Sequence, residues 1–154
     1  MSRDDRHPPA ANETIEKFGY PDTLLADYEH WVVLLRPQQA TLGAMVLACK
    51  EPVTAFPEIS QSAFNGLKAV TTDIETALRE AFSPDKINYL MLMMVDPHVH
   101  FHVVPRYGSA REFAGAAFED PGWPAVPNLG AVTEPEDAQR AELIAFLRDR
   151  WPAP

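Results

Sequence analysis

The chain has 154 residues, enough to bury a core in one domain, and its formal net charge is −9. Hydrophobic residues make up 46% and charged residues 23%, a globular mixture that excludes a wholly disordered chain. The acidic balance also argues against general binding of nucleic acid or anionic membranes, since neutralisation of phosphates by cationic side chains drives both.

The N-terminus and the cysteine content indicate a cytoplasmic protein. Residues 1–12 are polar, contain no signal-peptide apolar run, and are expected to form a mobile tail. The longest apolar stretch, Tyr89 to Val95, is too short to cross a bilayer. The single cysteine, Cys49, cannot form an intramolecular disulfide and lies in an apolar run, so we expect a buried thiol in a reducing compartment.

The first predicted elements are two strands joined by a turn. Residues 31–35 form a β-branched and aromatic run that Pro37 closes, and residues 41–49 form a second apolar run. The residues 36–39 between them fit a turn, which predicts an antiparallel hairpin.

A long helix is expected next, over residues 58–82. Its apolar residues recur at steps of three and four, which is the spacing of one helical face. Ser60 is the expected N-cap, and Pro84 ends the helix.

Two further strands and a second helix follow. Residues 86–95 are apolar on both faces and predict a central, buried strand, whereas residues 98–104 alternate between polar and apolar. Residues 107–132 are rich in glycine and proline and are expected to be irregular. The last helix is expected over residues 133–151 and opens on a capping box at Thr133.

This order of elements predicts an α+β fold, in which one long helix packs on an antiparallel sheet and a C-terminal helix is added. We expect residues 13–107 to form the main domain. Residues 108–154 are expected to form a proline- and glycine-rich extension whose helix packs on the same domain.

Three of the five histidines occupy alternate positions in the last predicted strand. Alternate side chains of a strand point to the same face, so His98, His100 and His102 are expected to share one face. The apolar residues between them are expected to face the core. The histidine face must then meet solvent, a ligand or a cleft.

Three interpretations of this row remain open. The first is a polar strand face that happens to contain histidine, which is only partly charged near neutral pH. The second is a zinc site, which histidines at i and i+2 can reach. However, the Cα atoms of His98 and His102 lie roughly 13 Å apart on a strand, so ligands from elsewhere are needed. The third is nucleophilic chemistry, in which one imidazole attacks phosphorus while its neighbours donate to phosphate oxygens.

The segment His98 to Val104 (HVHFHVV) resembles the signature of the histidine-triad family, in which three histidines alternate with hydrophobic residues. The order of elements from about residue 18 to residue 107 is also similar to that family, and closest to its divergent diadenosine-polyphosphate hydrolase-like branch. The resemblance implies an antiparallel sheet and a homodimer. It also implies hydrolysis or transfer at the α-phosphate of a nucleotide, through a covalent nucleotidyl-histidine.

The resemblance also implies roles for single residues. His100 would be the nucleophile, and His98 and His102 would orient it and contact phosphate oxygens or the leaving group. Asn88 lies near where the family often carries a polar substrate contact. The substrate would be a dinucleoside polyphosphate or a nucleoside phosphoramidate. No resident metal or cofactor is implied, and magnesium would enter only with a polyphosphate substrate.

The chain departs from the family at two places. Many members have a Gly-Gln or similar polar stretch before the triad, where this chain has the apolar residues 91–95. Many also have a Gly-His pair in the second strand, where this chain has Gly43 and Ala44. Two alternatives therefore stand beside catalysis: a non-catalytic nucleotide-binding module on the same fold, and a metal-binding protein that uses the histidine strand.

Outside the triad, Arg106 and Gln39 are further candidates for substrate binding. A guanidinium can bind a phosphate through two parallel hydrogen bonds, and an amide can bond to a ribose or a base. Arg36, which follows the first predicted strand, is a second arginine of this kind. Trp123 is expected to anchor the C-terminal extension by packing.

Overall fold

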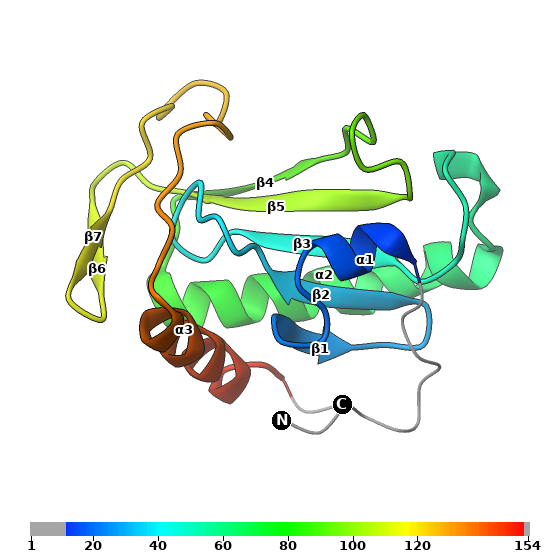
Figure 1. Cartoon of the computed structure of the whole chain (residues 1–154), viewed down its shortest axis with the longest axis horizontal. Helices are drawn as coiled ribbons and strands as arrows, with labels where there is room; N and C mark the ends of the chain where they lie inside the picture. Colours follow the sequence, from blue (N-terminus) through cyan, green and yellow to red (C-terminus); the bar gives the residue numbers. More distant parts are fainter. Residues whose placement is uncertain (1–11, 153–154) are drawn as a thin grey trace.

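The computed structural model describes residues 12–152, which fold around one main sheet (Figure 1). The strands are β1 (Leu24–Asp27), β2 (Trp31–Leu35), β3 (Met45–Cys49), β4 (Lys86–Leu90), β5 (His100–Arg106), β6 (Arg111–Phe113) and β7 (Ala116–Phe118). The helices are α1 (Glu13–Lys17), α2 (Gln61–Phe82) and α3 (Asp137–Asp149), with a 3-10 turn η1 (Phe56–Glu58) before α2. The sheet has the strand order β1-β2-β3-β5-β4 with antiparallel pairing, which confirms the predicted α+β fold.

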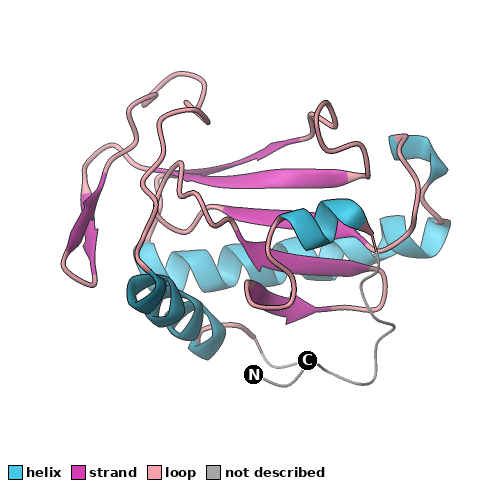
Figure 2. Cartoon of the chain, viewed as in Figure 1, coloured by secondary structure: helices cyan, strands magenta, loops and turns pink. Residues whose placement is uncertain are grey.

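Different helices cover the two faces of the sheet (Figure 2). On one face α2 packs against alternate residues of β2 and β3, and α3 completes the same core with Leu143 and Leu147. On the other face the short α1 inserts Ile15 over a second, smaller cluster that includes Val32. Successive residues of a strand alternate between faces, so the fully buried β2 contributes to both cores.

The long helix α2 has its predicted N-cap, Ser60, and its predicted end at Phe82, but it begins at Gln61 and not at Glu58. The Ser60 hydroxyl accepts a hydrogen bond from the backbone N–H of Ala63 at 3.1 Å, and η1 occupies the residues before it. At the other end Ser83 adopts a left-handed conformation, with φ of 46°, and Pro84 follows. Among the described residues, no helix is both long and apolar enough to cross a membrane.

The predicted strand over residues 86–95 is wrong in its length and its place. β4 ends at Leu90 and lies at the edge of the sheet, and Met94 beyond it is 84% exposed. An antiparallel pair must reverse the chain between its strands, so residues 91–99 form the loop from β4 to β5. His98 consequently lies in this loop rather than on the histidine strand.

The region 107–132 contains a hairpin of β6 and β7, where we expected irregular structure. Its turn residues Ala114 and Gly115 both have positive φ, 51° and 79°, which matches the twist of a hairpin. Hairpin turns of this kind usually contain Asn-Gly or Asp-Gly. This turn contains Ala-Gly, and alanine is uncommon at a position with positive φ, so the sequence carried no sign of the hairpin.

The predicted start of the last helix at Thr133 is also wrong. α3 begins at Asp137, and the backbone of Thr133 instead forms an isolated antiparallel bridge with Gln39. Pro135 lies between the two positions and has no N–H to donate. The side chain of Gln139 accepts from the backbone N–H of Glu136 and closes the first turn.

The N-terminal elements α1 and β1 were not predicted, because five and four residues are too few to show a periodicity. Asn12, which we assigned to the tail, is buried and caps α1 by accepting from the backbone N–H of Ile15 at 3.0 Å. Its amide also donates to the carbonyl oxygen of Cys49 at 2.9 Å, and Cys49 is buried as expected. The rest of the predicted tail, residues 1–11, lies outside the described residues.

A buried ion pair ties the C-terminal extension to β5. The Nε of Arg106 donates to the Asp120 carboxylate at 2.7 Å, and the two side chains are 4% and 0% exposed. The same carboxylate accepts from the backbone N–H of Tyr107 at 3.1 Å. Arg106 also donates to the side-chain oxygen of Asn88 on β4 at 2.8 Å, so one guanidinium joins two strands and the extension.

Replacing Asp120 with alanine is expected to lower the free energy of unfolding by about 3–5 kcal/mol, because the buried Arg106 guanidinium loses its carboxylate. Asp137→Ala is the matched control. Its carboxylate is 97% exposed beside Arg140, so its loss should change stability by less than about 1 kcal/mol. Urea denaturation at neutral pH measures both variants, and equal effects would contradict the assignment.

Candidate functional site

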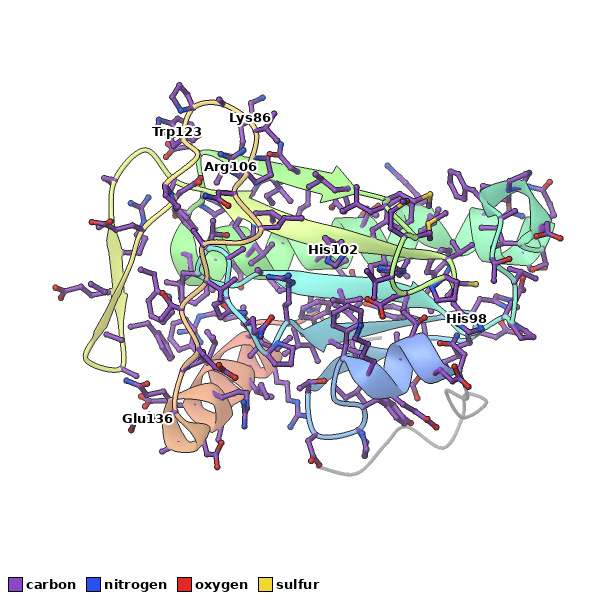
Figure 3. The ribbon with its side chains drawn as sticks, turned by 45° about the horizontal axis from the view of Figure 1, so that its top comes forward. Lys86, His98, His102, Arg106, Trp123 and Glu136 are labelled. Carbon is purple, nitrogen blue, oxygen red and sulfur yellow. The ribbon has the colours of Figure 1, made fainter. Side chains whose placement is uncertain are left out.

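His100 and His102 line a cleft of about 330 Å³ on the α1 side of the sheet. Its walls come from four parts of the chain: the end of α1, the turn after β2, the loop from β4 to β5, and the C-terminal extension. The residues that form these walls are Lys17, Phe18, Arg36, Gln38, residues 92–96 and Leu129. Figure 3 shows His98 near α1, and His102 farther along over the sheet.

The pairing register places the two strand histidines on the predicted face. His100 is opposite Ala48 and His102 is opposite Val46 on β3, and these two partners belong to the cluster under α1. Phe101, which lies between them in the sequence, packs against the core under α2, and Val103, which follows His102, is buried in it. The predicted division into a histidine face and an apolar face is therefore confirmed for β5.

His98 supports His100 through its backbone. The Nδ1 of His100 lies 2.7 Å from the carbonyl oxygen of His98. A carbonyl oxygen can only accept, so this Nδ1 carries the proton and the lone pair of neutral His100 is on Nε2. The ring of His98 is held elsewhere, with its Nδ1 3.0 Å from the hydroxyl of Thr14 on α1.

His102 is a neutral imidazole at pH 7. Its pKa is lowered to about 4, mainly by burial and to a smaller extent by the electrostatic effects of His100 and Arg36, against an opposite effect of Asp96. Within residues 12–152, its buried Nδ1 has no hydrogen-bond partner. Nε2 is then the nitrogen that remains to meet a bound group.

An aromatic ring and an ion pair shape the opening of the cleft. The ring centroid of Phe18 lies 5.8 Å from that of His100 and from that of His102, so it covers both imidazoles. Next to it, Lys17 Nζ lies 2.7 Å from the Asp96 carboxylate and joins α1 to the loop before β5. Sequence reasoning missed Lys17, Asp96 and Leu129, because α1 and the course of the loop were not predicted.

The predicted substrate-binding residues do not lie in this cleft. Arg106 and Asn88 are bonded to each other near the far end of β5, beside Lys86 and Trp123 (Figure 3). Gln39 is also buried. Its amide donates to the carbonyl oxygens of Arg36 and Ala44, and its oxygen accepts from Gly43 N–H. These side chains make hydrogen bonds within the protein, and their contacts with substrate stay a prediction.

The histidines do not assemble a metal site from the residues that the structure describes. No group of three histidine, cysteine, aspartate or glutamate side chains in that part of the chain is arranged to hold an ion. His98, which would extend a two-histidine set, has turned towards Thr14.

The fold is shared with solved structures of histidine-triad proteins. A histidine-triad protein from Sinorhizobium meliloti is 18% identical, covers 91% of this chain and 95% of its own, and has a TM-score of 0.71. The chain has the histidine-triad fold.

Two further solved structures have the same fold. A hypothetical histidine-triad nucleotide-binding protein from Sulfolobus tokodaii is 15% identical, covers 89% of this chain and 88% of its own, and has a TM-score of 0.65. A zinc-bound histidine-triad family protein from Mycobacterium smegmatis is 20% identical, with coverage of 88% and 88% and a TM-score of 0.59. No protein-family model and no curated protein matches the sequence.

The low pKa of His102 predicts a pH dependence of stability. Between its ordinary pKa of about 6.5 and about 4, the unfolded chain binds a proton that the folded chain does not. The free energy of unfolding should therefore fall as the pH drops through this range, by roughly 1–2 kcal/mol at pH 5. Urea titrations at pH 7.5 and pH 5 should show a smaller fall in His102→Gln than in the wild type. The same fall in both proteins would contradict the assignment.

Proposed function

We propose that the protein is a nucleotide hydrolase or nucleotidyl transferase that attacks the α-phosphate of its substrate with Nε2 of His100. The hydrogen bond from Nδ1 to the His98 carbonyl carries this proposal, because it leaves the lone pair on the other nitrogen. His100 is buried and lines the cleft, so little water competes for that nitrogen.

In the first step the His100 nitrogen forms a bond to phosphorus while the bond from phosphorus to the leaving group breaks. The leaving group departs with the electron pair of that bond and takes up a proton. His102, neutral near pH 7, donates from Nε2 to a phosphate oxygen and stabilises the charge that develops there. Water then attacks the phosphorus, the bond to nitrogen breaks, and a nucleoside monophosphate is released.

A nucleotide is the substrate class favoured by two observations. The fold is that of the histidine-triad proteins, one of which is called a nucleotide-binding protein. The cleft also combines cationic and aromatic side chains, which suit a phosphate and a base. We propose a dinucleoside polyphosphate or a nucleoside phosphoramidate as substrate. In this proposal the protein acts in the cytoplasm without a cofactor of its own, and magnesium enters only with a polyphosphate.

Two alternatives each have an observation in their favour. In the loop before β5 the residues 92–95 that line the cleft are all apolar, and the Asp96 carboxylate beside them is paired with Lys17, which favours a binding module without turnover. The zinc-bound protein from Mycobacterium smegmatis favours a metal site in this chain. Binding without turnover would support the first alternative, and activity lost with a chelator would support the second.

A panel of substrates tests the proposal: diadenosine tri- and tetraphosphate, adenosine phosphoramidate and adenosine phosphosulfate. The wild type is expected to release AMP from at least one, and His100→Ala should lower kcat by roughly a thousandfold or more. His98→Ala is the matched control. Every residue supplies a backbone carbonyl, so this variant keeps the acceptor for His100 and should retain far more activity.

Chromatography of the products and a chelator control complete the test, with added magnesium varied separately. A protein mass increased by one nucleotidyl group after a mildly alkaline quench would identify the covalent intermediate. Equal loss of activity in the two alanine variants would contradict the role given to the His98 carbonyl. Full activity in His100→Ala would overturn the proposal itself.

We further propose that the protein is a homodimer paired through the β4 edge. Beside that strand lies a hollow of about 760 Å³, lined by residues 86–90 and 123–127. Trp123 and Val126 on its rim are 37% and 76% exposed. An edge strand next to exposed apolar side chains is a favourable place for another chain to pair.

The wild type should therefore have a mass twice the 17.2 kDa of one chain in light scattering. Val126→Glu places a charge in the hollow and should shift the protein towards the monomer. Val132→Glu, outside the hollow and 39% exposed, is the matched control and should leave the mass unchanged. A monomeric wild type at micromolar concentration would contradict the dimer.

A further inference from the structure

Arg36 places a positive charge in the cleft without a neighbouring acid. Burial lowers the pKa of its guanidinium, and its Nε is buried without a hydrogen-bond partner in the described part of the chain. Among those same residues, no carboxylate lies within ion-pair distance of it. One guanidinium nitrogen, Nη1, donates to the carbonyl oxygen of Gln38 at 2.9 Å. A desolvated cation of this kind destabilises a protein unless something else compensates it.

Arg106, a buried arginine on β5, shows the contrast with the half-buried Arg36. Arg106 is fully engaged with the Asp120 carboxylate and the Asn88 amide. Inside the cleft, the remaining cation is Lys17, and its ammonium is already paired with Asp96 at 2.7 Å. His102 is neutral near pH 7, and the charges of Lys17 and Asp96 cancel each other. Arg36 therefore supplies the uncompensated positive charge of the cleft.

Both backbone polar groups of Arg36 are hydrogen-bonded within the protein. Its N–H donates to the carbonyl oxygen of Ala44 at 2.9 Å, and its own carbonyl oxygen accepts from the Gln39 amide at 2.7 Å. Gln39 is buried, and both its side-chain nitrogen and its side-chain oxygen are hydrogen-bonded to the backbone. It is therefore a positioning residue, which fixes the turn from which the guanidinium enters the cleft.

The register gives the place of this charge relative to the histidines. Leu34 on β2 is opposite Val46 on β3, which is opposite His102 on β5, and Arg36 lies two residues beyond Leu34. With strands about 4.8 Å apart and a rise of about 3.3 Å per residue, its Cα is roughly 12 Å from that of His102 and roughly 16 Å from that of His100. His102 thus lies between the nucleophile and the guanidinium.

We propose that Arg36 binds a second anionic group of the substrate, a phosphate on the far side of His102 from the phosphorus that His100 attacks. The identity of the first phosphate rests on the proposed function. The second phosphate lies either in a polyphosphate chain or on the ribose. A guanidinium suits both, because its planar fork makes two parallel hydrogen bonds to phosphate oxygens.

Binding measurements with three nucleotides test this without any need for turnover. Isothermal titration calorimetry would compare AMP, which carries one phosphate, with ADP and with adenosine 3′,5′-bisphosphate, which carry two. One of the two-phosphate probes should bind the wild type about tenfold to a hundredfold more tightly than AMP. In Arg36→Gln that gain should vanish, and Arg36→Lys should keep part of it. The probe that shows the gain identifies the position of the second phosphate.

Two controls separate a binding role from a structural one. Arg140→Gln removes a surface arginine outside the cleft and should leave the affinities unchanged. Arg36→Gln should have the same Tm as the wild type or a higher one, since it removes an uncompensated charge. A lower Tm, with equally weaker binding of all three probes, would show a structural role and overturn the proposal.

The remaining outcomes distinguish this inference from the proposed function. If neither two-phosphate probe gains over AMP, or if Arg36→Gln keeps the gain, the second anionic site is overturned even where the enzyme turns over its substrates. If the gain is present and depends on Arg36 while no substrate is turned over, the second anionic site stands and the catalytic proposal fails.

Discussion

The hydrogen bond from the His100 ring to the His98 carbonyl depends on a chain of contacts that begins in the sheet. Asn12 bonds to the end of β3 and caps α1, and α1 then holds the loop before β5 through Thr14 and Lys17. That loop carries the carbonyl group. A helix of only five residues therefore determines which nitrogen of the central histidine is free to react.

The two faces of the sheet have different tasks. The face under α2 and α3 buries the larger apolar cluster, and the burial of apolar area is the main favourable contribution to folding. The cleft on the α1 side contains two residues with buried polar atoms that have no hydrogen-bond partner in the described chain, His102 through Nδ1 and Arg36 through Nε. Unpaired buried polar groups are destabilising, and the stable core on the opposite face lets the protein tolerate them.

The sequence was informative wherever a period or a cap is strong. The heptad-like spacing and Ser60 located α2, and the alternation of residues 100–103 located the histidine face. It was misleading where tertiary context decides, since the apolar run after Leu90 became a loop at the edge of the sheet. The burial of Gln39 and Arg106 within internal hydrogen bonds could not be predicted for the same reason. The placement of Arg36, already a candidate from the sequence, also follows from the pattern, since it continues the alternation of Val32 and Leu34 on the face that carries the histidines.

The bridge between Gln39 and Thr133 joins two parts of the chain that are distant in sequence. The backbone N–H of each residue donates to the carbonyl oxygen of the other at 2.9 Å. These two hydrogen bonds attach the C-terminal extension to the turn that bears Arg36. Leu129 from the same extension reaches the cleft wall. A substitution in the extension can therefore change the shape of the cleft wall, and the position of the turn that bears Arg36, without altering the histidines of β5.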